Sequence, residues 1–180
     1  AKVNFYRITA LIALSLLGAC AQAASPLNMN AGRVISTIKY NGPFKDNIIV
    51  GTVSGGEETN PLWTSEISNA GFERALELTL EDNGFLSKSG GDFELSANLA
   101  EVRQPFFGLS FTVNSAVDYV LNKSAKTQKA VCHFFINGSG TAGLSDKIYG
   151  VARLKLANEL SIKNNLTQMI SHLLDCSKKI

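Results

Sequence analysis

Residues that could do chemistry are few in this chain, and their spacing does not favour catalysis. There are three cysteines and two histidines. His133 directly follows Cys132, but neighbours in a strand point to opposite faces, so the two cannot work as a thiolate and its base. Ser139 has glycines on both sides rather than the Gly-x-Ser-x-Gly spacing that presents a nucleophile. The acidic pair Glu57-Glu58 is more typical of a solvated loop.

Metal and nucleotide sites are not predicted either. His172 and His133 lie in different segments, and there is no His-Glu-x-x-His pattern to place two ligands on one helical face. No Gly-x-x-x-x-Gly-Lys phosphate loop occurs. We therefore expect no metal, no cofactor and no enzymatic activity. The alternative is an enzyme whose site is built from scattered residues.

The third cysteine, Cys20, ends an apolar N-terminal segment. Lys2 and Arg7 precede an apolar run over residues 8–17, and small residues follow at 18–21. This order is typical of a secretory signal. The run is too short to span a bilayer, which requires ~20 residues.

Two processing routes fit this segment. Leu17-Gly18-Ala19-Cys20 resembles the lipobox of bacterial lipoproteins, in which the cysteine thiol receives a diacylglycerol and the chain is cut before it. The resemblance implies a signal over 1–19, a lipid anchor and tether over 20–32, and one domain over 33–180. The absence of Asp after Cys20 implies an outer-membrane address. The alternative is a cut after Ala23, which would remove Cys20.

Cys132 and Cys176 are the two remaining thiols of a chain bound for an oxidising compartment. Strand alternation places Cys132 on an apolar face with Ala130, Phe134 and Ile136. Cys176 lies on or beside an apolar helical stripe that recurs at three- and four-residue steps, formed by Ile162, Leu166, Met169 and Leu173. We expect a disulfide between strand and helix; the alternative is two buried free thiols.

The elements that position these residues predict one α+β domain. Alternation and turn residues indicate strands at 34–40, 48–53, 93–101, 109–121 and 129–137. A helix is expected from the Asn60-Pro61 cap to the Asn83-Gly84 stop, and another over 149–175, after a glycine-rich connection at 138–143. The order β(β)αβββα predicts a two-layer sandwich, with two helices on one face of a mainly antiparallel sheet of three to five strands.

Phe106 and Phe107 stand between the two longest predicted strands, in Gln104-Pro105-Phe106-Phe107-Gly108. Turns favour polar residues, so this pair is a candidate contact for a partner or a lipid. The alternative is a loop that folds back and plugs the end of the sandwich.

Charge excludes one class of partner. The chain has 17 basic and 15 acidic residues, and removing Lys2 and Arg7 with the signal leaves 15 of each. There is no basic stripe, so nucleic-acid binding is not expected.

The lipobox, linker and β-α-β-β-β-α order are similar to small envelope lipoproteins of lipid export. These are the lipoprotein that plugs the lipopolysaccharide translocon and the auxiliary lipoproteins of ABC-type lipid transporters. Segments 55–85, 104–108 and 149–165 resemble an uncharacterised family of proteobacterial lipoproteins. The resemblance implies a periplasm-facing accessory anchored in the outer membrane through Cys20, with a protein partner and lipid or lipopolysaccharide as binding partners. An envelope hydrolase, an acyltransferase and a regulator of cell-wall synthesis are the alternatives.

Overall fold

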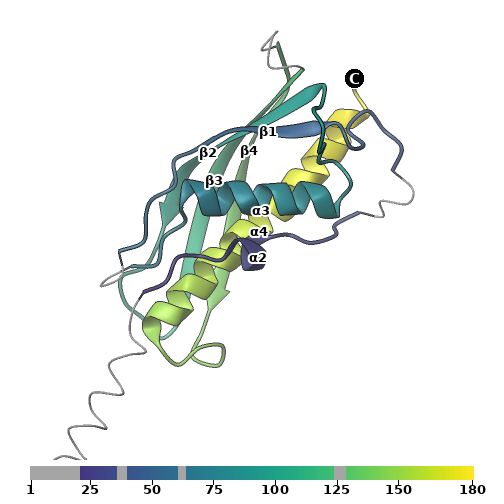
Figure 1. Ribbon diagram of the computed structural model, residues 1–180. Helices are drawn as coiled ribbons and strands as arrows, with labels where there is room; N and C mark the ends of the chain where they lie inside the picture. The colour runs from purple at the N-terminus through teal and green to yellow at the C-terminus, as the bar shows by residue number, and fades with distance from the viewer. Residues whose placement is uncertain (1–20, 36–39, 61–63, 124–128) are drawn as a thin grey trace, which may run out of the picture.

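The computed structural model describes residues 21–35, 40–60, 64–123 and 129–180. Its elements are α2 (Pro26–Met29), β1 (Ile48–Ser54), α3 (Asn69–Asp82), β2 (Phe93–Arg103), β3 (Phe111–Lys123), β4 (Lys129–Ala142) and α4 (Gly150–Ser177). The strands form one sheet in the order β1-β2-β3-β4, and the helices cover one face of it (Figure 1). The predicted α+β two-layer sandwich is confirmed.

The sheet is mixed rather than wholly antiparallel. β1 runs parallel to β2, whereas β2, β3 and β4 pair antiparallel. Parallel neighbours need a crossover connection, and α3 supplies it by crossing the sheet between β1 and β2. The single parallel pair is therefore a consequence of the βαβ order at the start of the domain.

Helix α3 begins later than the sequence predicts. The expected start at Asn60-Pro61 is wrong, because the described residues of this segment run outside any helix until Ser68. The Ser68 hydroxyl accepts a hydrogen bond from Gly71 N at 3.1 Å and caps the first turn. The predicted end is confirmed, since Asn83 is the C-terminal cap and Gly84 has φ of 70°.

The strand predicted over 34–40 is not found in its described part. Val34 and Ile35 lie in an irregular segment, and residues 36–39 lie outside the described residues. Both backbone N–H groups donate to Asn83 Oδ1, at 2.8 and 3.1 Å. The Asn83 amide in turn donates to Gly32 O and Thr79 O, each at 2.8 Å. This buried side chain satisfies backbone groups that a sheet neighbour would otherwise satisfy.

The long strands match the predicted alternation. Residues 93–101 form most of β2, and the inward set of β3 is buried: Phe111, Val113, Ser115, Val117, Tyr119 and Leu121. Leu109 is an exception, because β3 begins at Phe111 and leaves Leu109 73% exposed in the preceding loop.

The glycine-rich segment belongs to β4 up to Ala142 rather than to a connection. Gly138 and Gly140 face α4, where an added Cβ would overlap Ser161 O at position 138, and Ser161 N at position 140. The two glycines therefore let the helix backbone lie against the strand. From composition alone, the same glycine-rich residues are predicted to form a loop.

Residues 21–32, expected to be a tether, instead pack on the domain. Ala24 and Met29 are buried in the main core, and α2 contacts both α3 and α4. Glu159, buried on α4, accepts hydrogen bonds from Ser25 N at 2.8 Å and from Asn28 Nδ2 at 3.0 Å. The composition rich in Ala, Ser and Asn resembles a linker, but these specific contacts fix the segment.

Among the helices of the described residues, none has the length and apolar character needed to cross a membrane.

Candidate functional site

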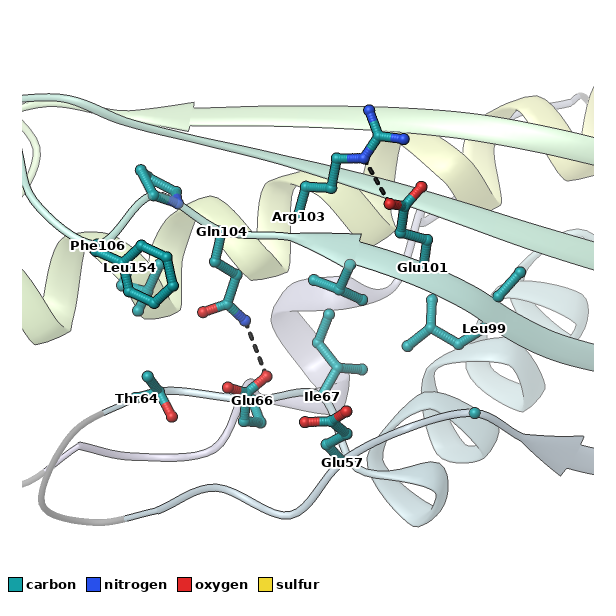
Figure 2. Close-up of a pocket in the computed structure, with 14 residues that line it drawn as sticks. Glu57, Thr64, Glu66, Ile67, Leu99, Glu101, Arg103, Gln104, Phe106 and Leu154 are labelled. Carbon is teal, nitrogen blue, oxygen red and sulfur yellow. Dashed lines mark hydrogen bonds and ion pairs between the residues drawn. The ribbon is translucent and has the colours of Figure 1, made fainter.

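A groove of about 730 Å³ opens beside the end of β2 (Figure 2). Its walls are residues 99–103 of β2, the following loop with Gln104, Pro105 and Phe106, and five residues that come after β1 in the chain: Gly55, Glu57, Thr64, Glu66 and Ile67. Leu154 of α4 closes one side. Four parts of the chain thus meet here: the residues after β1, the end of β2, the loop that follows β2, and α4.

The groove follows an edge of β2 that has no neighbouring strand among the described residues. The pairing of β1 with β2 ends at Ser54, opposite Asn98, while β2 continues to Arg103. Leu99 and Val102 give this stretch apolar side chains, and Ile67 lies across from them. An unpaired strand edge can hydrogen-bond an added extended chain.

Carboxylates dominate the charge of the groove. Glu57, Glu66 and Glu101 line it together with one cation, Arg103. The Arg103 guanidinium bonds Glu101 and holds the pKa of that exposed carboxyl below its usual value. Glu57 and Glu66 are not bonded to Arg103, so the opposite wall of the groove is negatively charged.

Glu66 is half-buried, and burial raises the pKa of its carboxyl above the ordinary value of 4.5. A hydrogen bond from Thr64 opposes this rise, the negative charge of Glu57 adds to it, and a bond from Gln104 opposes it. Gln104 Nε2 lies 2.9 Å from Glu66 Oε2 and 3.1 Å from Ser65 O, and so ties the loop after β2 to the opposite wall.

The groove has no pairing of nucleophile and base among the described residues that line it. His133 lies on the other face of the sheet, with Nε2 2.6 Å from Asp118 Oδ1, and His172 stacks on Phe134. Nor do the described residues contain a group of three side chains that could hold a metal ion. What the groove offers chemically is binding, through apolar walls, carboxylates and a strand edge.

Cys132 of β4 and Cys176 of α4 are joined by a disulfide, with their Cα atoms 6.4 Å apart. The bond links the sheet to the last turns of the terminal helix. Tyr119 lies nearby in the same core, and burial raises the pKa of its hydroxyl well above 10.0.

Phe106 and Phe107 are 96% and 88% exposed. They do not fold back onto the end of the sandwich, and Phe106 stands at the mouth of the groove. Their role as a contact for a partner or lipid stays a prediction. Cys20 lies outside the described residues.

Arg153 was not identified from the sequence, and neither were Glu66, Glu101 and Arg103 of the groove. Arg153 is buried, its Nη1 donates to Ile148 O at 2.6 Å and to Lys147 O at 3.1 Å, and its Nη2 lies 3.4 Å from Gly108 O. The guanidinium also stacks over Phe111, 5.2 Å from the ring centroid. The only signal in the sequence is a charged residue within an apolar helical stripe.

No protein-family model and no curated protein matches the chain. Solved structures that share its fold include two bacterial proteins. Protein XCC0632 from Xanthomonas campestris, of family DUF330, has a TM-score of 0.55 at 12% identity, over 74% of this chain and 86% of that one. A candidate lipoprotein from Caulobacter crescentus has a TM-score of 0.50 at 16% identity, over 76% of this chain and 92% of that one. At these identities the likeness concerns the fold alone.

Proposed function

We propose that this protein is a lipid-anchored, non-enzymatic lipoprotein of the bacterial envelope that binds a partner component on the periplasmic side of the outer membrane. The groove along the free edge of β2 carries the binding role, because it combines an unpaired strand edge, apolar walls and carboxylates without a catalytic pair among its lining residues. The fold shared with a candidate lipoprotein supports the envelope assignment.

The packing of residues 21–23 supports the lipid anchor over the alternative cut after Ala23. Ser65 is buried, and its hydroxyl donates to Gln22 O at 2.6 Å. A cut after Ala23 would remove this acceptor, and a buried hydroxyl without its partner costs about 1–3 kcal/mol. A cut before Cys20 keeps the contact, and the thiol of Cys20 can then carry the lipid.

The partner that fits the groove is an extended protein segment with basic residues. Such a segment can pair with residues 100–103 of β2 as an added strand, beyond the point where Gly55 lies against Leu99 O, while its basic side chains meet Glu57 and Glu66. Transport of lipid or lipopolysaccharide is the setting we propose, on the resemblance to lipoproteins of lipid-export machines.

The test is co-purification of the tagged, full-length protein in mild detergent from its own membranes, followed by mass spectrometry of the bound proteins and lipids. The mature chain should begin at an acylated Cys20, and a component of a lipid-export machine should be recovered. Glu57→Lys, in the groove, should lower that recovery several-fold. Glu58→Lys is the matched control, because it makes the same charge change at an exposed neighbour that does not line the groove.

Three results would contradict the proposal. A mature chain that begins at Ala24 removes the anchor. A protein repeatedly recovered alone and free of lipid, or equal losses with both glutamate variants, removes the binding role of the groove.

A further inference from the structure

Exposed apolar side chains gather at one end of the molecule. The described residues include ten large hydrophobic side chains that are exposed, and six of these lie in two loops. The loops are the one between β2 and β3 and the one between β4 and α4. We name this set the apolar tip: Phe106, Phe107, Leu109, Leu144, Ile148 and Tyr149. Exposures of 73–96% for its four most exposed members mean that the described domain itself does not cover them.

Arg153 holds the two loops of the apolar tip together. Its guanidinium donates to the carbonyls of Lys147 and Ile148 in one loop and reaches Gly108 O in the other. Because Arg153 is buried and also packs on Phe111, the two loops are fixed to the start of α4. The exposed residues therefore form one supported surface rather than two independent loops.

The described chain begins beside this surface. Gln22 Oε1 lies 3.3 Å from Lys155 Nζ, and Gln22 lines a hollow of about 500 Å³ together with Lys147. In Figure 1 the start of the purple segment lies next to the N-terminal end of α4, whereas the C-terminus lies at the far end of the molecule. The apolar tip and residue 21 thus share one end of the domain.

On the side of the apolar tip next to the hollow the charge is mostly positive, whereas the groove beside Phe106 is lined by Glu57, Glu66 and Glu101. Lys147, Lys155 and Lys163 line the hollow with Leu27, Leu156 and Leu160. Its one carboxylate, Glu159, is buried, accepts bonds from Ser25 and Asn28, and forms an ion pair with Lys155 at 3.7 Å, which leaves Lys147 and Lys163, among the described residues, as the unmatched positive charges of the hollow. Asp146, in the adjoining loop, accepts a bond from Gly143 N at 2.8 Å. Exposed apolar and aromatic side chains flanked by lysines are what an anionic lipid surface binds.

We propose that the apolar tip docks on an anionic lipid surface, with Lys147 and Lys155, near the start of α4, at the level of the headgroups. The inference rests on the proposed lipid anchor. Ala21 is only 6% exposed, and consecutive Cα atoms are about 3.8 Å apart, so acyl chains on Cys20 hold this end of the domain at the bilayer without a flexible linker. A lipid anchor is more stable with a second contact, and the tip supplies it.

Docking also sets the orientation of the groove. Phe106 belongs to both the apolar tip and the rim of the groove, so the groove opens close to the membrane surface. The end of α4, with the disulfide of Cys176, then points away from the bilayer.

The test measures binding of the mature chain with Cys20→Ser to vesicles by co-sedimentation. The vesicles contain phosphatidylcholine alone or equal parts of phosphatidylcholine and phosphatidylglycerol. We expect binding to the anionic vesicles, a loss of about tenfold or more with Phe106→Ser and Phe107→Ser together, and a loss of roughly fivefold with Lys147→Gln. Phe135→Ser, at a 57% exposed site on β4, is the matched control and should leave binding unchanged.

Absence of binding to anionic vesicles would overturn the inference, as would equal losses with the Phe135 control. So would a fall in the solution mass of the protein with the double Phe variant, because the tip would then bind a second copy. Circular dichroism and the melting temperature of each variant show whether it is folded. The protein carries no lipid in this experiment, so its failure is distinct from failure of the Cys20 anchor, which the mass of the native mature chain tests.

Discussion

At the scale of single residues, the carboxyl group of Glu66 is partly buried and so partly shielded from water. Burial raises its pKa above 4.5, so the folded state favours the protonated form more than the unfolded state does. The stabilisation is therefore fully present below the unfolded pKa and is lost as the pH rises through the folded pKa. At neutral pH the charged form of Glu66 is a small cost to folding.

Glu66→Gln should remove this dependence on pH. The amide keeps an oxygen for the bond from Gln104 Nε2 but carries no charge. We expect the free energy of unfolding to match that of the natural chain near pH 4 and to exceed it near pH 7, by less than about 1 kcal/mol because the group is partly exposed. Urea denaturation from about pH 4 to about pH 8 measures this.

Glu58→Gln serves as the control, because it makes the same substitution at an exposed residue that does not line the groove. A Glu66→Gln variant that is less stable than the natural chain at neutral pH would mean that the carboxylate stabilises the fold, and the expectation would be wrong.

At the scale of elements, the contact between β4 and α4 depends on two positions without a side chain. Gly138 lies against Ser161 O, and Gly140 lies against Ser161 N and Ala157 O. Alanine is a better strand residue than glycine by roughly 0.5–1 kcal/mol, so a substitution free of overlap would stabilise β4. A Gly→Ala substitution in β4 should therefore lower the stability where the backbone of α4 contacts the glycine, and raise it where there is no such contact.

Gly138→Ala should destabilise the protein by about 1–3 kcal/mol, because the Cβ overlaps a backbone carbonyl that cannot move without shifting α4. The melting temperature and the free energy of unfolding measure the loss. Gly143→Ala is the matched control: its nearest neighbour would be Asp146 Oδ2 at 3.8 Å, an ordinary contact, and its stability should change little. A stabilised Gly138→Ala variant would contradict the close approach.

At the scale of the whole molecule, the disulfide joins residues separated by 44 positions and so restricts the unfolded chain. The chain-entropy relation for a loop of this length gives about 4 kcal/mol. Cys132→Ala with Cys176→Ala should lower the free energy of unfolding by about 3–4 kcal/mol while leaving the folded structure intact.

Chemical denaturation of the double variant beside the oxidised parent measures this difference, and a thiol count after denaturation without reductant measures the bond itself. Two free thiols in the parent chain, or a loss below about 1 kcal/mol in the variant, would contradict a stabilising disulfide. The two single Cys→Ala variants are the controls, since each removes the bond but leaves one thiol.

Also at this scale, the proposed anchor, the apolar tip and the mouth of the groove occupy one end of the domain. The first described residues, the two apolar loops and the free edge of β2 come from distant parts of the chain, and Arg153, Gln104 and Ser65 connect them through hydrogen bonds. The proposed binding role at a membrane surface rests on this arrangement rather than on any single motif.

The sequence by itself determined the features that depend on local periodicity. Alternation at 93–101 and within 111–121 identified β2 and β3 and their inward faces, and three- and four-residue steps identified α4. Each pattern reflects the geometry of one element, in which side chains repeat every 2 or 3.6 residues. The same patterns placed Cys132 and Cys176 toward one core, and the Asn83-Gly84 pair marked the end of α3 because its backbone geometry is local.

Only the tertiary structure decided which distant residues satisfy one another. Asn60-Pro61 has the residues of a helix start, but Ser68 is the cap; Gly138 and Gly140 have the composition of a loop, but α4 packs on them; Ala21 to Gly32 resembles a tether, but Glu159 and the core hold it. The partners of Arg153 are also decided by the tertiary structure, since the carbonyls that it binds lie in two different loops. The physical reason is that local pattern encodes which face of an element is apolar, whereas hydrogen-bond partners and close backbone contacts arise only when the folded chain brings remote segments together.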